Sequence, residues 1–409
     1  MQNNNTEPHL KRSISLPLVT FYGIGTILGA GIYVLVGKVA GEAGMATPFA
    51  FLLASLLAGF SAFSYAELSS RYPRSAGEAV YLHAAFGIKH FSLIMGLLII
   101  TIGLVSAATM IHGFVGYLGV FIDMSPLLTK LLLVVVLASI VTWGIGESII
   151  FASLLTIIEI VGLLIIVWVT KDKLAEAPMM ISQFIPPMET SVLIGVFMGA
   201  FIAFYAFVGF EDIVNVAEEV IDPVKNVPRA VIWSLVVTTL FYFIISTAAV
   251  VTLSPEKLAS SDAPLAMIYE HQTGQHATVI AVISLLSVIN GALIQIVMAS
   301  RVLYGLSEQH WIPAYFGHVN KTTRTPINAT LVVSVIILIL VMWLPLLSLA
   351  KITSLITLIV FALINLALFI IKLREQKHEA FSIPLWVPLT GFITCSGFVF
   401  FQLYHAVAS

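Results

Sequence analysis

The sequence predicts an all-α integral membrane protein in which two of the membrane-spanning helices are interrupted. Of its 409 residues, 59% are hydrophobic and only 10% are charged, and the mean hydropathy is +1.04. A soluble domain has about 25% charged residues. Apolar segments long enough to cross a bilayer recur along the whole chain, and glycines interrupt the first and the sixth of them. The composition therefore excludes a soluble protein.

The apolar segments predict eleven spans in a single transmembrane domain over residues 16–405, after a polar N-terminal tail at 1–15. No small-residue cleavage site follows the first segment, so we interpret it as a helix and not as a removed signal peptide. The expected spans are about 16–39, 46–70, 88–120, 125–144, 149–170, 192–219, 228–252, 276–305, 326–345, 350–372 and 384–405. A further short external helix is expected near 269–276.

Lysine and arginine predict the orientation, because the loops on the cytoplasmic side carry an excess of them. With the N-terminus inside, thirteen of these residues fall on the cytoplasmic side and six on the outer side. We therefore expect a multi-pass protein of the cell membrane, a bacterial inner membrane, with a cytoplasmic N-terminus. The only cysteine, Cys395, excludes a disulfide framework and a cysteine-based metal site.

The first span contains the stretch from Gly25 to Ile32, which has three glycines. Each glycine costs a helix about 1 kcal/mol relative to alanine. Inside a bilayer, a backbone group that such a break leaves free finds no water, so a break is tolerated where it lines a cavity or meets a bound partner. The stretch is either a ligand site or a small-residue face that lets two helices pack closely.

A second break is expected because many transporters consist of two inverted repeats, each of which opens with an interrupted helix. The first repeat would cover about 16–170 and the second about 192–372, with an extra helix at about 384–405. The sixth span does contain Gly209 near its middle, followed by Glu211 and Asp212. The correspondence between spans one and six favours a transporter.

Motifs at several positions resemble those of one family. They are Gly29-Ala30-Gly31-Ile32, Tyr65-Ala66-Glu67-Leu68, Tyr205-Ala206-Phe207-Val208-Gly209-Phe210-Glu211, Ala217-Glu218-Glu219 and Ala299-Ser300-Arg301-Val302-Leu303-Tyr304. The chain thereby resembles the amino acid–polyamine–organocation (APC) permeases, and among them the cationic-amino-acid-transporter-like branch. The resemblance implies a LeuT-type fold with five-plus-five inverted repeats and discontinuous helices 1 and 6. Many members have twelve spans, one more than we expect here.

The resemblance also implies a substrate site at the two breaks. Half-helix N-termini suit a carboxylate, and unwound carbonyl groups suit an ammonium group or a cation. The implied carboxylate site is formed by the amides of Ala30 and Gly31, with Gly29 and Ile32 adjacent. The implied ammonium site is formed by the carbonyls of Ile27, Tyr205, Ala206 and Val208, and Phe204 and Gly209 complete the break. Tyr205 takes the position of a family aromatic residue that gates the site, or it packs in the core as an ordinary aromatic side chain.

Glu159 lies about midway between Ser148 and Lys171, at the expected centre of the bilayer. A charge there costs on the order of 2.5–3.5 kcal/mol, so the side chain should face the interior of the bundle. Several permeases of the resembled branch carry a lysine at this position, so the lysine's role does not transfer. Three interpretations follow: Glu159 carries a proton in each cycle, it binds a cation together with helix-one carbonyls and Ser287, or it is a permanently protonated group that bonds a neighbouring helix.

The expected function is secondary active transport of amino acids by alternating access, linked to protons or working by exchange. Alternatives are a polyamine or other organic-cation exchanger and a sodium-coupled amino acid symporter with a cation site near Glu159. We find no hydrolase or zinc-protease motif and no nucleotide-binding loop, so neither an enzyme nor an ATP-driven pump is expected. The expected partners are a small amino acid or amine, a proton or sodium, and the lipid bilayer. No cofactor, metal or nucleic acid is expected, and the chain should be a monomer.

Overall fold

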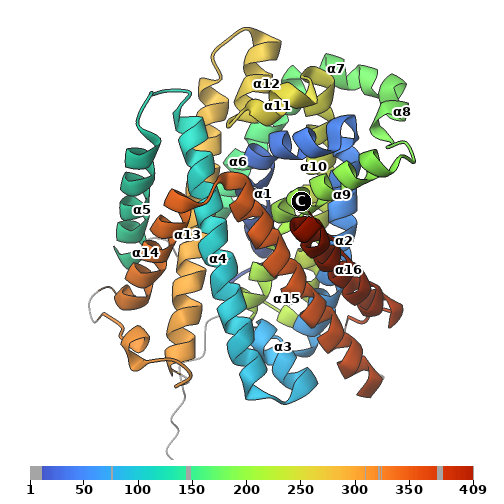
Figure 1. The fold of residues 1–409 in the computed structure, drawn as a ribbon. Coiled ribbons are helices and arrows are strands. Elements are labelled where there is room, and N and C mark those ends of the chain that lie inside the picture. Colours follow the sequence, from blue (N-terminus) through green and yellow to red (C-terminus); the bar gives the residue numbers. More distant parts are fainter. Residues whose placement is uncertain are drawn as a thin grey trace, which may run out of the picture.

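The structure is a computed structural model that describes residues 12–74, 77–143, 149–308, 310–320, 323, 325–374 and 381–408. Within these ranges every regular element is a helix, and two residues, Ile14 and Val220, form an isolated bridge. The helices form an upright bundle, with short helices at both ends (Figure 1). The predicted all-α architecture is confirmed.

Each of the eleven expected spans overlaps an apolar helix of the described residues. In the part of the chain that the structure describes, nine segments are long and apolar enough to cross a membrane. The first of them, Leu16–Arg71, contains both α1 and α2, and α14 is a shorter apolar helix. The helices are α1 (Leu16–Ala43), α2 (Thr47–Arg71), α4 (Lys89–Leu118), α5 (Pro126–Trp143), α6 (Ile149–Val169), α9 (Thr190–Phe204), α10 (Pro223–Thr252), α13 (Thr278–Glu308), α14 (Ile327–Trp343), α15 (Leu346–Arg374) and α16 (Trp386–Ala408). The sixth span continues from α9 through the 3₁₀ segments η4 (Tyr205–Phe207) and η5 (Phe210–Glu219).

Short helices cover the two ends of the bundle. One end carries α7 (Lys171–Glu176), α8 (Ile181–Phe184), α11 (Pro255–Ser260) and α12 (Pro264–Thr273), and α12 overlaps the expected short helix near 269–276. The opposite end carries α3 (Gly77–Phe86), which connects α2 to α4 (Figure 1). We refer to these as the α12 end and the α3 end. Short 3₁₀ turns complete the connections: η1 (Gly44–Ala46), η3 (Ala177–Met180) and η6 (Ala314–Gly317).

Helix α1 lies inside the bundle, where it contacts α6, α9, α10 and α13. In the segment that holds α1 and α2, 82% of the most apolar window is buried, against 28% in α5 and in α16. The side chains on the outer helices are apolar although exposed, for example Val135, Trp143 and Phe400. Lipid, and not water, suits such a surface. The chain is therefore a multi-pass membrane protein whose interior is organised around α1.

Both predicted interruptions are present, one in the first span and one in the sixth. Helix α1 departs from helical geometry at Gly29 (φ 12°, ψ −136°). Helix α9 ends at Phe204, and after one 3₁₀ turn Val208 is extended and Gly209 has φ 132°. Only glycine adopts that last conformation readily. The break in α1 is narrower than the eight-residue stretch from Gly25 to Ile32 that the sequence indicated, because Gly29 is the residue at which the helical geometry is lost.

A buried ionic network holds the α3 end together. The carboxylate of Glu67 in α2 accepts hydrogen bonds from Arg71 at 2.7 Å, from Lys372 of α15 at 2.8 Å and from the Ile383 amide at 2.8 Å. The Glu67 side chain is fully buried, and that of Lys372 is 11% exposed. The network joins α2, α15 and the segment that leads into α16.

Removing one cation from this network should destabilise the fold. We expect Lys372→Met to lower the free energy of unfolding by about 3 kcal/mol, because the buried Glu67 carboxylate loses one of its two cations and breaking a buried ion pair is strongly destabilising. Thermal unfolding in detergent, followed by tryptophan fluorescence, measures the change. The matched control is Lys225→Met, since Lys225 pairs with Asp222 at 3.2 Å on the surface and such pairs contribute less than about 1 kcal/mol. Equal losses in the two variants would contradict the prediction.

Candidate functional site

The two breaks lie against each other in the middle of the bundle. A Cβ atom added to Gly31 would lie 2.5 Å from the Cα of Ala206, and one added to Gly209 would lie 2.5 Å from the carbonyl oxygen of Thr26. The Thr26 hydroxyl donates a hydrogen bond to the Gly209 carbonyl at 2.9 Å. The backbones of α1 and of the sixth span are therefore in direct contact, and glycine is the residue that fits at both positions.

Tyr242 of α10 connects the two breaks through its hydroxyl group. The oxygen lies 2.6 Å from the Ile27 carbonyl and 2.7 Å from the Ala206 carbonyl, and the side chain is fully buried. A phenol has one hydrogen, so it donates to one of these carbonyls at a time. Both carbonyls belong to the set expected to hold an ammonium group. No motif in the sequence marks Tyr242, although a tyrosine within a long apolar segment needs a partner for its hydroxyl group.

The other residues expected at the breaks are also brought together. Ile27, Ile32, Phe204, Tyr205, Ala206 and Val208 are all buried. The Tyr205 carbonyl accepts a hydrogen bond from the Val208 amide at 3.1 Å. Ala30 and Gly31 follow the break directly, at the beginning of the second half of α1, where the first N–H groups of a helix lack partners within it. Their binding of a carboxylate stays a prediction.

The Tyr205 hydroxyl group has a partner on α4. It lies 3.1 Å from Oγ of Ser106, and it donates to the Ser106 carbonyl at 3.3 Å. A buried tyrosine usually pairs its hydroxyl in this way. The contact holds the ring against α4 beside the break, which is compatible with both interpretations of Tyr205, the gate and the core aromatic.

Glu159 faces the interior of the bundle, as its position required. The residue is completely buried, and neither carboxyl oxygen has a hydrogen-bond partner among the residues that the structure describes. The polar side chains that face it are Ser287 and Asn290 of α13. The Ser287 hydroxyl donates to the Gly29 carbonyl at 3.0 Å, and the Tyr33 hydroxyl donates to the backbone carbonyl of Glu159 at 2.6 Å.

This arrangement places a carboxyl group beside the break in α1. Helices α6 and α1 also pack closely at Gly25, where an added Cβ atom would clash with Oγ1 of Thr156. A buried carboxyl group without a partner is costly, so an ion or a proton must compensate it. Ser148, one of the two residues from which the depth of Glu159 was judged, lies outside the described residues.

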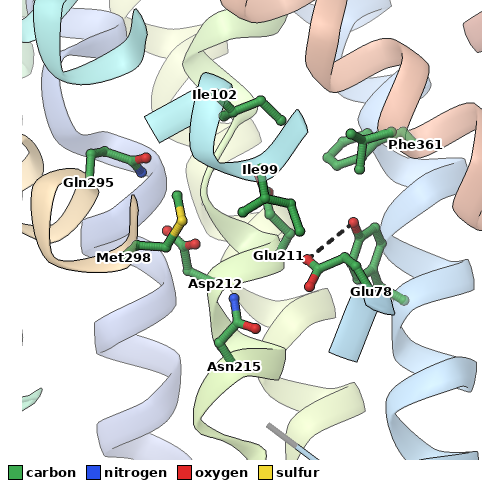
Figure 2. A pocket seen from close by; sticks show the side chains of 11 residues that line it. Glu78, Ile99, Ile102, Glu211, Asp212, Asn215, Gln295, Met298 and Phe361 are labelled. Atoms are coloured by element: carbon green, nitrogen blue, oxygen red, sulfur yellow. Dashed lines mark hydrogen bonds between the residues drawn. The ribbon is translucent and has the colours of Figure 1, made fainter. Parts of the chain in front are cut away.

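Two of the acidic residues that follow the second break line a cavity. The Glu211 carboxylate accepts a hydrogen bond from the Gly209 amide at 2.8 Å, so it caps the start of η5. Asp212 faces the cavity together with Glu78 of α3 and Gln295 of α13 (Figure 2). The sequence indicated Glu211 and Asp212, but it gave no signal for Glu78, which reaches the cavity from a ten-residue helix.

Similarity to known proteins agrees with this geometry. A multi-pass helical bundle with two facing helix breaks at its centre is the architecture of LeuT-type secondary transporters. The solved structures include a Na⁺-coupled sialic acid symporter in a substrate-bound, outward-open state, whose fold is similar with a TM-score of 0.64 at 14% sequence identity. The similarity covers 95% of this chain and 89% of that one, and at this identity it concerns the fold alone.

The chain belongs to the amino acid permease family of the APC superfamily, whose model matches residues 14–408. It is 27% identical to the mitochondrial cationic amino acid transporter 3 of Arabidopsis thaliana, over 92% of this chain and 66% of that protein. It is equally 27% identical to the branched-chain amino acid permease BcaP of Bacillus subtilis, over 92% and 85%. A third relative, 27% identical over 94% and 86%, is the methylthioribose transporter of Bacillus subtilis.

The relatives define the class and not the substrate. Their names give a cationic amino acid, branched-chain amino acids and methylthioribose at the same level of identity. The chain spans just under two thirds of the length of the plant transporter. The family is one of permeases, and its members are not enzymes.

Proposed function

We propose that this protein is a secondary active transporter that moves amino acids across the cell membrane by alternating access around the two facing breaks. The observation that carries the proposal is the contact of the breaks themselves, where the Tyr242 hydroxyl group bridges the Ile27 and Ala206 carbonyls at 2.6 and 2.7 Å. A group that carries an ammonium can replace the phenol at these carbonyls. The neighbouring amides of Ala30 and Gly31 suit its carboxylate.

We further propose that the α3 end faces the cytoplasm and that Glu159 couples transport to a proton or to a sodium ion. Ser287 faces the Glu159 carboxyl group and donates a hydrogen bond to the Gly29 carbonyl. A cation bound at this point would contact both the Glu159 carboxyl group and an unwound carbonyl group. The alternative of an organic-cation exchanger is favoured by one observation, the carboxyl groups that line the cavity near Asp212.

Uptake into liposomes tests the proposed function. Purified protein is reconstituted and given radiolabelled leucine or radiolabelled lysine, with and without a proton or sodium gradient. We expect saturable uptake of at least one of them, together with counterflow when the liposomes are loaded with the unlabelled amino acid. Non-saturating, ohmic currents without counterflow would instead indicate a channel and would contradict alternating access.

A further inference from the structure

The chain between α6 and α9 contains an apolar stretch that lies outside the long helices. From Ala177 to Met188 it has no charged residue. Four large apolar side chains of this stretch are between 59% and 92% exposed: Met179, Ile181, Ile185 and Met188. Contiguous exposed apolar surface marks a site of contact with another protein or with a membrane. We call residues 177–188 the apolar connection.

A second long connection at the α12 end provides an internal comparison. Residues 253–277, all of them described by the structure, join α10 to α13 through α11 and α12. Their side chains Leu258, Leu265 and Ile268 are completely buried, and none of the exposed large hydrophobic residues falls in this range. In Figure 1, α11 and α12 lie over the middle of the bundle, whereas α8 lies at its margin. The two connections are therefore suited to different surroundings, water over the middle and an apolar medium at the margin.

The apolar connection adjoins the lipid-facing surface of the bundle on two sides. Helix α7, which precedes it, contacts α6 and α10, and α8 within it contacts η1 and the beginning of the chain's second span, α2. Trp168 near the end of α6 and Phe49 in the first turn of α2 are both exposed. Such side chains on the long helices face lipid. The apolar connection thus continues a surface that lipid already covers.

The residues just before the apolar connection form a pair that is typical of a bilayer surface. Nζ of Lys171 lies 4.5 Å from the centroid of the Trp168 ring. Tryptophan is enriched at the boundary between lipid and water, and a lysine near a helix end lays its stem along apolar surface while its charge stays in water. The pair indicates that this boundary lies at the end of α6. Ala177 follows it after the single short helix α7.

The charges decide which kind of lipid fits. Lys173 of α7 pairs with Glu176 at 3.2 Å, and Asp172 lies between Lys171 and Lys173. Recognition of anionic headgroups requires a cluster of basic residues, and the apolar connection contains none. Contact with hydrocarbon is what it offers, so zwitterionic phospholipid suffices as the partner.

We propose that the apolar connection lies in the headgroup layer of the leaflet at the α12 end and inserts Ile181 and Ile185 among the first acyl carbons. These two residues are four positions apart, so they lie on one side of the helical turn, with Gln183 on the other. A segment of this kind buries its apolar side chains about 5–10 Å into the boundary between headgroups and acyl chains. Because Thr190 begins α9, the anchor holds the start of the sixth span at the bilayer surface. The proposal does not depend on what the protein transports.

Fluorescence quenching in liposomes tests the proposal on the full-length protein. Ile181→Cys and Ile185→Cys are made separately, labelled with monobromobimane and reconstituted. Cys395 is buried, so the unmodified protein should take up little label. We expect phosphatidylcholine brominated near the glycerol end of its acyl chains to lower the bimane fluorescence by about half in both variants, because the labels lie at that depth. Iodide on both sides of the membrane should quench the same labels weakly.

Two further variants are the controls. Lys257→Cys places the label on an exposed position of α11 in the comparison connection, and Gln183→Cys places it on the opposite side of the same turn. Iodide should quench both of these labels more strongly than the brominated lipid does. Should Ile181→Cys or Ile185→Cys not fold, Met188→Cys takes its place with the same expected result.

Each other outcome overturns the proposal. Stronger quenching of Ile181→Cys and Ile185→Cys by iodide than by brominated lipid would place the apolar connection in water. Weak quenching by both reagents would show that protein covers it, such as a second copy of this chain. Equal responses of Ile185→Cys and Gln183→Cys to both reagents would contradict a segment with one side in lipid.

Discussion

Gly209→Ala is expected to abolish most of the transport activity, with a loss of at least about 10-fold in the initial rate of uptake. Two physical reasons combine. Gly209 has φ 132°, which an L-residue with a side chain adopts only at a cost of order 1–3 kcal/mol. The added Cβ would also lie 2.5 Å from the Thr26 carbonyl oxygen and 3.0 Å from the Ile27 amide nitrogen, both backbone atoms of α1. The measurement is uptake of the labelled amino acid into liposomes at equal protein incorporation.

The matched control for this variant is Gly305→Ala. Gly305 lies within α13, and nothing is within 4 Å of the Cβ that alanine would add. In the interior of a helix, alanine is more favourable than glycine by up to about 1 kcal/mol. The control should therefore transport normally and be at least as stable as the unmodified protein. Gly31→Ala, which places a Cβ 2.5 Å from Ala206 Cα, should behave like Gly209→Ala. Uptake within twofold of the unmodified protein in both break variants would show that the contact of the breaks is not needed for transport.

Glu159→Gln is expected to remove the dependence of uptake on pH or on sodium and to change the rate about 10-fold at the pH where the unmodified protein is fastest. Glutamine keeps the shape of the side chain but cannot ionise. A tenfold change corresponds to about 1.4 kcal/mol, which is less than the cost of about 2.5–3.5 kcal/mol for a charge at the bilayer centre. Uptake is measured over a series of pH values, each with and without sodium.

The outcomes of this series separate the interpretations of Glu159. Loss of the pH dependence alone supports a proton carrier, and loss of the sodium dependence alone supports a cation site with Ser287 and the Gly29 carbonyl. An unchanged profile in both respects would leave only a structural, permanently protonated carboxyl group. Glu189→Gln is the control, because Glu189 is exposed just before α9, and its profile should match that of the unmodified protein.

The spans were predictable because the bilayer imposes a length and a composition on each of them. For example, α2 was expected at about 46–70 and is Thr47–Arg71, and α6 was expected at about 149–170 and is Ile149–Val169. A helix must satisfy its own backbone within the hydrocarbon region, so sequence alone limits what these segments can be. The two breaks were predictable for the same reason, since glycine at mid-span marks where the helix does not continue.

The partners of the breaks were not predictable from the sequence. Tyr242 is 215 residues from Ile27, whose carbonyl it contacts, and Ser287 is 258 residues from Gly29. Such contacts depend on which faces of α1, α10 and α13 meet. A mid-span tyrosine or serine forms equally well an ordinary hydrogen bond between helices.

The sequence by itself determined that the protein is a bundle of membrane helices, that its first and sixth spans are broken and that Glu159 lies in one of the apolar helices, because each of these follows from the cost of polar groups in lipid. Only the tertiary structure decided that the breaks touch through Gly31 and Gly209, that Tyr242 joins them and that Glu78 meets Asp212 and Gln295 in one cavity. Those contacts join residues far apart in the chain, and helix packing, not local composition, brings them together.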